Sequence, residues 1–133
     1  MAIADYTKAI ELDPEYKEAY YNRGATYGAK EQYDLAIADY TKAIELDPEY
    51  KKAYFSRGVT YGAKEQYDLA IADYTKAIEL DPEYMEAYYN RGVTYGAKEQ
   101  YDLAIADYTK AIELDPENEK AYVNRANTYR TQE

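Results

Sequence analysis

Three residue types are missing from this 133-residue chain, which contains no cysteine, no histidine and no tryptophan. Without cysteine there is no disulfide framework and no thiolate chemistry, and the redox compartment stays open. Without histidine the chain lacks the most common acid–base group and metal ligand. Glycine is scarce, with six residues and no pair at the spacing of a phosphate-binding loop. We therefore expect no enzyme activity, no catalytic residue, no cofactor and no metal site.

Long hydrophobic runs are also absent. No apolar stretch is long enough to cross a bilayer, and the amino terminus, MAIADYTKAIELD, carries acids where a secretion signal carries bases. Twenty-six acidic residues outnumber 16 basic ones, which gives a net charge of -10 that repels nucleic acid and anionic lipid. We expect a soluble protein, with the cytoplasm as the favoured compartment, whose partner is a neutral or basic peptide or protein and neither nucleic acid nor a membrane.

The sequence is rich in repetition and in tyrosine. The block AIADYTKAIELDP begins at Ala2, Ala36, Ala70 and Ala104, so the chain is a tandem array with a period of 34 residues. We divide it into units 2–35, 36–69, 70–103 and a partial unit 104–133, within a single domain. The 20 tyrosines combine a large apolar body with a hydroxyl, which suits half-buried seams and binding faces.

Each unit has two segments with helical periodicity. Apolar residues recur at intervals of three and four along both segments, which predicts two amphipathic helices per unit. We expect a tight turn near residues 31–33 within each hairpin. Between hairpins, we expect Asp47 to cap the next helix and Pro48 to open it. Stacked hairpins would bury the apolar stripes that a lone hairpin leaves exposed.

The spacing of one unit resembles the tetratricopeptide repeat, whose signature places large, small, aromatic and alanine residues at fixed intervals. The residues that carry the resemblance are Tyr20, Arg23, Gly24, Tyr27, Ala36, Tyr40, Ala43 and Pro48. The resemblance covers practically the whole chain and implies an all-α, right-handed superhelical solenoid of antiparallel hairpins, with about eight helices. It also implies that the first helix of each hairpin lines an inner groove that holds peptides or partner proteins.

Two features depart from the family pattern. The usual leucine is replaced by arginine, and the usual turn glycine by Glu31, Glu65 and Glu99. An arginine on a packing stripe is costly unless it is paired, and an aspartate repeats in step with it. We expect Arg23 to reach Asp39 or Asp5; the alternative is a solvated arginine whose stem alone packs.

The first helices differ among copies, whereas the second helices are identical. The differing positions lie on an arc opposite the packing stripe, and the family resemblance implies that this arc is the inner groove. Free drift of exposed residues is the alternative, although other exposed positions do not vary. The candidate peptide-binding residues are Tyr21, Asn22, Ala25, Gly28, Phe55, Ser56, Val59, Gly62, Tyr89, Asn90, Val93, Gly96, Val123 and Asn127. Family members that grip acidic tails use lysine and asparagine here, so such a tail is not expected.

The ends of the chain suggest a second function. The chain opens on a second helix, residues 2–12, and closes on a first helix, residues 117–130, so copies could stack head to tail as a self-associating structural or engineered block without its own ligand. The rival interpretation makes the last helix a polar cap. Near-identical copies fit recent duplication and design equally. The candidate self-association residues are Ala2, Tyr6, Ala9, Tyr122, Ala126 and Tyr129.

Overall fold

The structure is a computed structural model that describes residues 1–133 as eight α-helices without strands. The helices are α1 (Ala2–Leu12), α2 (Lys17–Ala29), α3 (Tyr33–Leu46), α4 (Lys51–Ala63), α5 (Tyr67–Leu80), α6 (Met85–Ala97), α7 (Tyr101–Leu114) and α8 (Glu119–Gln132). This confirms the all-α prediction and the number of helices. None of the eight combines the length and the apolar character that a bilayer span requires.

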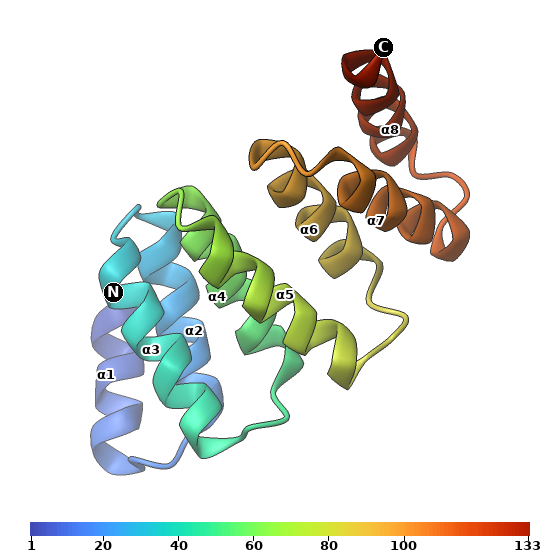
Figure 1. The fold of residues 1–133 in the computed structure, drawn as a ribbon. Coiled ribbons are helices and arrows are strands. Elements are labelled where there is room, and N and C mark those ends of the chain that lie inside the picture. The colour runs from blue at the N-terminus through green and yellow to red at the C-terminus, as the bar shows by residue number, and fades with distance from the viewer.

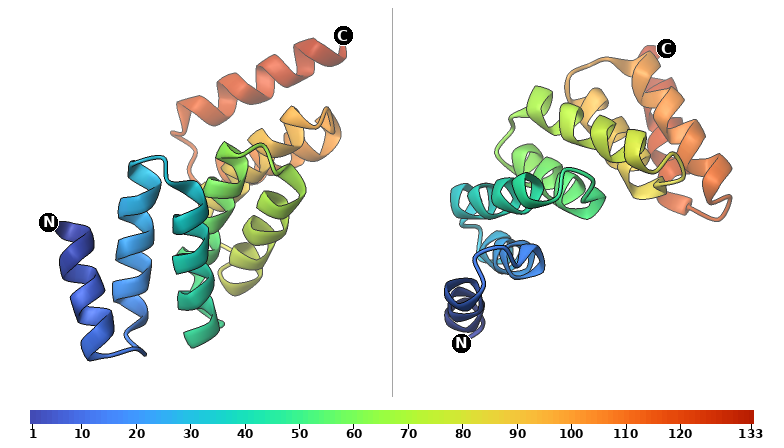
Figure 2. Two further views of the ribbon diagram at one scale, coloured as in Figure 1. Left: turned by 90° about the vertical axis from the view of Figure 1, so that its left-hand side faces the viewer. Right: turned by 90° about the horizontal axis from the view of Figure 1, so that it is seen from below.

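The helices form a row of antiparallel hairpins, α2 with α3, α4 with α5 and α6 with α7 (Figure 1). The first helices α2, α4, α6 and α8 touch one another in sequence, whereas the second helices of successive hairpins do not. Each second helix packs on the first helix of the next hairpin, but successive second helices stay apart, so the row curves with the first helices on its concave side. Helices α1 and α8 lie at opposite ends of the row in both views of Figure 2. The expected solenoid of hairpins is therefore confirmed.

Small residues allow the helices to approach closely. Ala36, Ala43 and Ala53 have no exposed surface, and Tyr40 is 4% exposed. The Tyr40 ring lies directly against Gly24, where an added Cβ would meet Cε1 at 2.9 Å. A side chain at Gly24 would therefore displace the ring. The core is built from alanine and tyrosine at helix crossings rather than from large aliphatic residues.

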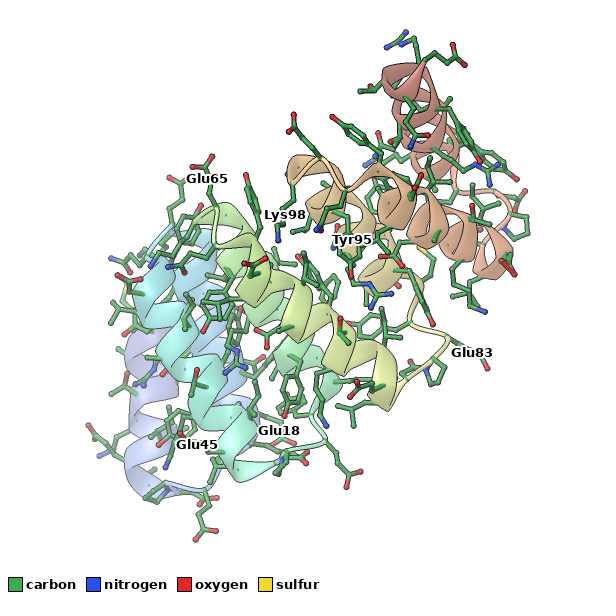
Figure 3. All side chains as sticks on the ribbon, in the orientation of Figure 1. Glu18, Glu45, Glu65, Glu83, Tyr95 and Lys98 are labelled. Carbon is green, nitrogen blue, oxygen red and sulfur yellow. The ribbon has the colours of Figure 1, made fainter.

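The turn inside each hairpin places glutamate in an unusual backbone conformation. Glu31 has φ of 60°, in the left-handed region that favours glycine, and Glu65, labelled in Figure 3 at the turn between α4 and α5, and Glu99 repeat this. The Gln32 amide donates to the Tyr27 carbonyl and the Glu31 amide to the Gly28 carbonyl, both at 2.9 Å. These two bonds form a Schellman motif with glutamate at the glycine position. The turn thus keeps the family geometry although the glycine is absent.

The connection between hairpins differs from our expectation. Helix α4 begins at Lys51 with Tyr50 as its N-cap, so Pro48 lies in a preceding turn and does not open the helix. The Asp47 carboxylate accepts the amide of Glu49 at 3.1 Å and thereby stabilises this turn, not the start of α4. The prediction was wrong because an Asx turn satisfied the carboxylate before the helix began. Helix α8 also starts two residues later than expected, after the N-cap Asn118.

The arginine on the packing stripe is paired as predicted, and its partner is Asp39. Arg23 Nε and Nη2 each donate to one Asp39 oxygen at 2.8 Å. Asp5 takes no part. The same bidentate pair recurs for Arg57 with Asp73 and for Arg91 with Asp107. No buried side-chain nitrogen or oxygen lacks a hydrogen-bond partner, so this polar seam is fully satisfied.

Candidate functional site: the concave face of the first helices

Three aromatic residues stand in a row on the concave side, one on each of α2, α4 and α6. Tyr21, Phe55 and Tyr89 are half-buried, so they are neither sealed in the core nor scattered to different faces. Tyr21 packs against Tyr40 with ring centroids 5.6 Å apart and against Tyr50 at 5.3 Å. Tilted pairs at these distances hold each ring in place. The structure thus presents fixed rings with part of each surface open to the groove.

The next two rings are fixed in a similar way. The ring centroid of Phe55 lies 5.8 Å from that of Tyr74 and 5.1 Å from that of Tyr84, and the ring centroids of Tyr89 and Tyr108 are 5.9 Å apart. The residue equivalent to Tyr50 and Tyr84 beside the third ring is Asn118, which removes one aromatic neighbour. The row therefore becomes more polar and more open toward α8.

Hydrogen bonds link neighbouring first helices. The hydroxyl of Tyr21 and Oγ of Ser56 lie 3.0 Å apart, and Asn124 Nδ2 donates to the Tyr89 hydroxyl at 2.7 Å. Phe55 has no hydroxyl, so Asn90, at the matching place on α6, has no such partner. Sequence reasoning missed these links, which join residues 35 positions apart rather than 34. Ser56 is therefore engaged within the protein, whereas the side-chain amides of Asn22 and Asn90 make no hydrogen bond within it, and Asn22 is exposed.

Burial keeps the neighbouring tyrosine hydroxyls protonated. Desolvation by burial is the main cause that raises the pKa of Tyr40 to about 12, and it does the same for Tyr50. A tyrosine with an ordinary pKa of about 10 is already neutral at pH 7, and burial extends the neutral form of both rings to higher pH. The groove floor beneath Tyr21 carries no tyrosinate charge that would repel an anionic or attract a cationic ligand.

Cavities lie between two of the three pairs of neighbouring first helices. The cavity between α2 and α4 has a volume of about 380 Å³, and the one between α6 and α8 about 260 Å³. Ala25, Gly28 and Val59 line the first, and an added Cβ at Gly28 would meet nothing nearer than 3.9 Å. The recurrent glycine thus leaves open floor rather than permitting a close helix contact. Val93, Gly96 and Asn127 line the second.

The cavities also include residues that sequence reasoning missed. Tyr33, the first residue of α3, borders the cavity between α2 and α4, and Tyr101 of α7 borders the equivalent one. Both belong to the unvarying part of the repeat, so a comparison of copies carried no signal for them. Val123, which we had placed with the groove residues, is 57% exposed and lines neither cavity.

A third and larger cavity, of about 500 Å³, lies at the edge of the groove where α6 meets the α7–α8 loop. Phe55, Met85 and Tyr89 supply its apolar surface, and Asp115 lies at its border. We did not predict this site. Neither here nor elsewhere in the chain do three histidine, cysteine, aspartate or glutamate side chains gather in a way that could hold a metal ion.

The candidate self-association residues lie on the two end helices. Tyr6 and Ala9 on α1 are half-buried, whereas Tyr122 and Tyr129 on α8 are 43% and 48% exposed. Arg125 repeats the packing-stripe arginine and donates to Thr109 at 3.1 Å, but it has no carboxylate partner. Asp5 repeats the paired aspartate and is exposed. Helix α8 therefore carries the arginine of the recurring ion pair without its aspartate, and helix α1 carries the aspartate without its arginine.

Family models match the chain along its length. Models described as tetratricopeptide repeat match residues 18–50 and 86–118, and residues 39–72 and 107–133. A model described as TPR repeat matches residues 1–30 and 60–99, more than half of the chain. A search of the curated proteins found no match.

Solved structures share the fold over nearly the whole chain. The crystal structure of MamA matches with a TM-score of 0.94 and 29% identity, covering 98% of this chain and 76% of that one. The first TPR of Spaghetti (RPAP3), bound to the HSP90 peptide SRMEEVD, matches with a TM-score of 0.86 and 27% identity over 90% and 95%. The Arabidopsis OM64 TPR domain matches with a TM-score of 0.85 and 27% identity over 88% and 97%.

Proposed function

The chain belongs to the tetratricopeptide repeat family, and from that premise we propose that it is a scaffold that binds a peptide or protein segment along its concave face. The observation that carries the proposal is the row of Tyr21, Phe55 and Tyr89, which ring packing fixes and which has cavities beside Phe55 and Tyr89. A segment in the groove would insert apolar side chains beside the rings and meet the free amides of Asn22 and Asn90. The activity proposed is binding without catalysis.

The ligand differs in charge from the peptide seen on RPAP3. SRMEEVD carries three acidic residues, whereas the groove positions that hold lysine and asparagine in family members that grip acidic tails here hold tyrosine or phenylalanine and alanine or valine. The net charge of -10 adds general repulsion of acidic peptides, which salt weakens. We therefore propose a neutral or basic segment.

A random peptide library displayed against the protein tests this function. For peptides that bind, Phe55→Ala should weaken affinity about tenfold or more, because it removes the central ring of the row. Leu69→Ala provides the matched control, since Leu69 is an apolar residue on α5 with 48% exposure and should change affinity less than about twofold. Equal effects of the two changes, or preferred selection of acidic peptides, would contradict the proposal.

A second function, head-to-tail association of copies, is favoured by the two unpaired halves of the seam. Asp39, the partner of Arg23, lies 16 residues after it in the sequence. Arg125 has no aspartate at that distance, and in the 34-residue register the equivalent aspartate is Asp5. Asp5 of another copy would therefore fill this place. We propose that α8 of one copy packs on α1 of the next, with Arg125 pairing with Asp5 across the junction.

Charge exchange tests this association. Sedimentation of the 133-residue protein over a concentration series should show assembly that either Asp5→Arg or Arg125→Asp abolishes. The double variant restores the pair in reverse and should assemble again. A monomer at every concentration, or assembly that ignores both single changes, would exclude the junction described here.

A further inference from the structure

Along one edge of the groove, two junctions between hairpins each hold a lysine of the protein itself. Lys17 Nζ lies 2.5 Å from Asp47 Oδ2, and Lys51 Nζ lies 2.7 Å from Asp81 Oδ2. Each ammonium also lies over a tyrosine ring, at 5.3 Å from the centre of Tyr50 for Lys17. The hydrogen bond with Lys17 is the main cause that lowers the pKa of Asp47. Carboxylate and ring together therefore form a place for one cation.

The third junction has the same carboxylate without the cation. Met85 stands where Lys17 and Lys51 stand, and Asn118 stands where the tyrosine stands. Asp115 still accepts the amide of Glu117 at 3.2 Å, as Asp47 accepts that of Glu49, so the loop keeps its turn. No ammonium or guanidinium of the protein lies within ion-pair distance of Asp115. At the first two junctions a lysine of the protein pairs with the aspartate, and at the third junction Asp115 has no such cation.

The residues that replace the lysine and tyrosine do not satisfy Asp115. Asn118 Nδ2 points to Met85 Sδ at 3.3 Å, and its side-chain oxygen accepts the amide of Ala121 at 3.2 Å as the cap of α8. Both ends of the amide are thus occupied. Asp115 keeps acceptor capacity toward the cavity of about 500 Å³ beside it.

Charge at the corresponding positions becomes steadily more negative along the edge. The first junction has three lysines and three acids, and the second has two lysines and three acids. At the third, one lysine faces four acids: Glu86, Asp115, Glu117 and Glu119. That lysine, Lys120, makes no ion pair. A cation is therefore attracted most strongly to the cavity at the third junction.

We propose that this cavity receives the side chain of a lysine or arginine from the bound segment, with its charged group beside Asp115 in the place that Lys17 and Lys51 fill at the other junctions. Its aliphatic stem lies on Met85 and Phe55, and its charge meets Asp115 and the surrounding glutamates. The inference rests on the proposed function and adds to it the position of a basic residue in the ligand. It also fixes the ligand's register, because only one of the three junctions is open.

The test uses Nα-acetyl-lysine N-methylamide as the probe, with the norleucine analogue as its uncharged counterpart. Backbone amide shifts of Asp115 and of residues 117–120 should follow the lysine probe with saturation at millimolar concentration, and the norleucine probe should bind about threefold to fivefold more weakly. Met85→Lys supplies an internal ammonium to Asp115 and should abolish the response. Lys51→Met should open an equivalent response around Asp81, and circular dichroism checks that both variants fold.

Other outcomes overturn the inference. Equal responses to the two probes would show that charge is not recognised, and an unchanged titration of Met85→Lys would place the probe elsewhere. Shifts spread evenly over all acidic segments would indicate general attraction only. Phe55 borders this cavity as well as the groove, so Tyr21→Ala, whose side chain lies outside the cavity, reports on the groove separately in the library experiment. Peptides that depend on Tyr21 but do not prefer a basic residue would refute this site and leave the proposed function standing.

Discussion

Replacing Arg57 by leucine should destabilise the protein strongly, although leucine is the usual family residue at this position. Arg57 makes two hydrogen bonds of 2.8 Å to Asp73 and one of 3.1 Å to Thr41. Its guanidinium lies 5.8 Å from the ring centres of both Tyr54 and Tyr61. The Asp73 side chain is only 7% exposed. Arg57→Leu would leave this carboxylate buried without its partner.

The size of the loss follows from that burial. Breaking a buried ion pair by removal of one partner costs about 3–5 kcal/mol. The arginine side chain is 18% exposed, and leucine recovers some packing, so we expect about 3 kcal/mol for Arg57→Leu. The matched control is Arg125→Leu. Within one chain Arg125 contacts a threonine and a tyrosine ring at 5.7 Å but no carboxylate, so at concentrations where the protein is monomeric Arg125→Leu should cost less than about 0.5 kcal/mol.

Urea denaturation followed by circular dichroism measures both changes. In Arg57→Leu with Asp73→Ala, the stranded charge is gone, so the double variant should be more stable than the sum of the two single losses predicts, by at least about 1.5 kcal/mol. Equal losses for Arg57→Leu and Arg125→Leu would refute the reasoning, because they would show that the carboxylate contributes nothing. Strict additivity in the double variant would refute it independently.

Three further predictions concern the backbone and the tyrosines. Gly62→Ala should stabilise the protein by about 1 kcal/mol, because an added Cβ there meets only the Tyr74 hydroxyl at 4.0 Å. Gly58→Ala should destabilise it, because the added Cβ would meet Cε1 of the Tyr74 ring at 2.9 Å. Thermal melting temperatures of the two variants should therefore shift in opposite directions. Glu65→Gly should raise the free energy of unfolding by about 0.5–1 kcal/mol, because it relieves a φ of 60°, and an unchanged urea midpoint would contradict this. Stability should fall as pH rises above about 10, because unfolded tyrosine ionises there while burial keeps the pKa of Tyr40 at about 12; a urea midpoint that does not fall between about pH 9 and pH 11 would argue against the linkage.

Much of the fold was predictable because it depends on short-range periodicity. The 34-residue period and the helical spacing indicated two helices per unit, and the arginine on the packing stripe required a partner that repeats in step. The structure confirms the pairing and identifies Asp39 rather than Asp5 as the partner of Arg23. The sequence alone could not choose between Asp39 and Asp5. Asp39 lies 16 residues after Arg23 and Asp5 lies 18 residues before it, and each is on a second helix beside α2.

The groove itself was only partly predictable. Variation among copies pointed to Tyr21, Phe55 and Tyr89, and the structure places all three in a row on the first helices. Variation could not indicate Tyr33, which is the same in every complete copy and yet borders a cavity. Nor could it show that Tyr21 meets Ser56 of the next hairpin, because that contact depends on how far one hairpin is displaced along its neighbour.

The amino-acid sequence by itself determined the helices, their number and the faces that they bury, because each of these follows from residue order within one turn or one repeat. Tertiary structure decided what the differences between nearly identical copies mean. Met85 is an unremarkable surface substitution in the sequence, but stacking brings it to Asp115, and there it leaves a carboxylate without the lysine that its equivalents hold. The physical reason is that charge pairs and cavities form between hairpins, at distances that only the stacking geometry sets.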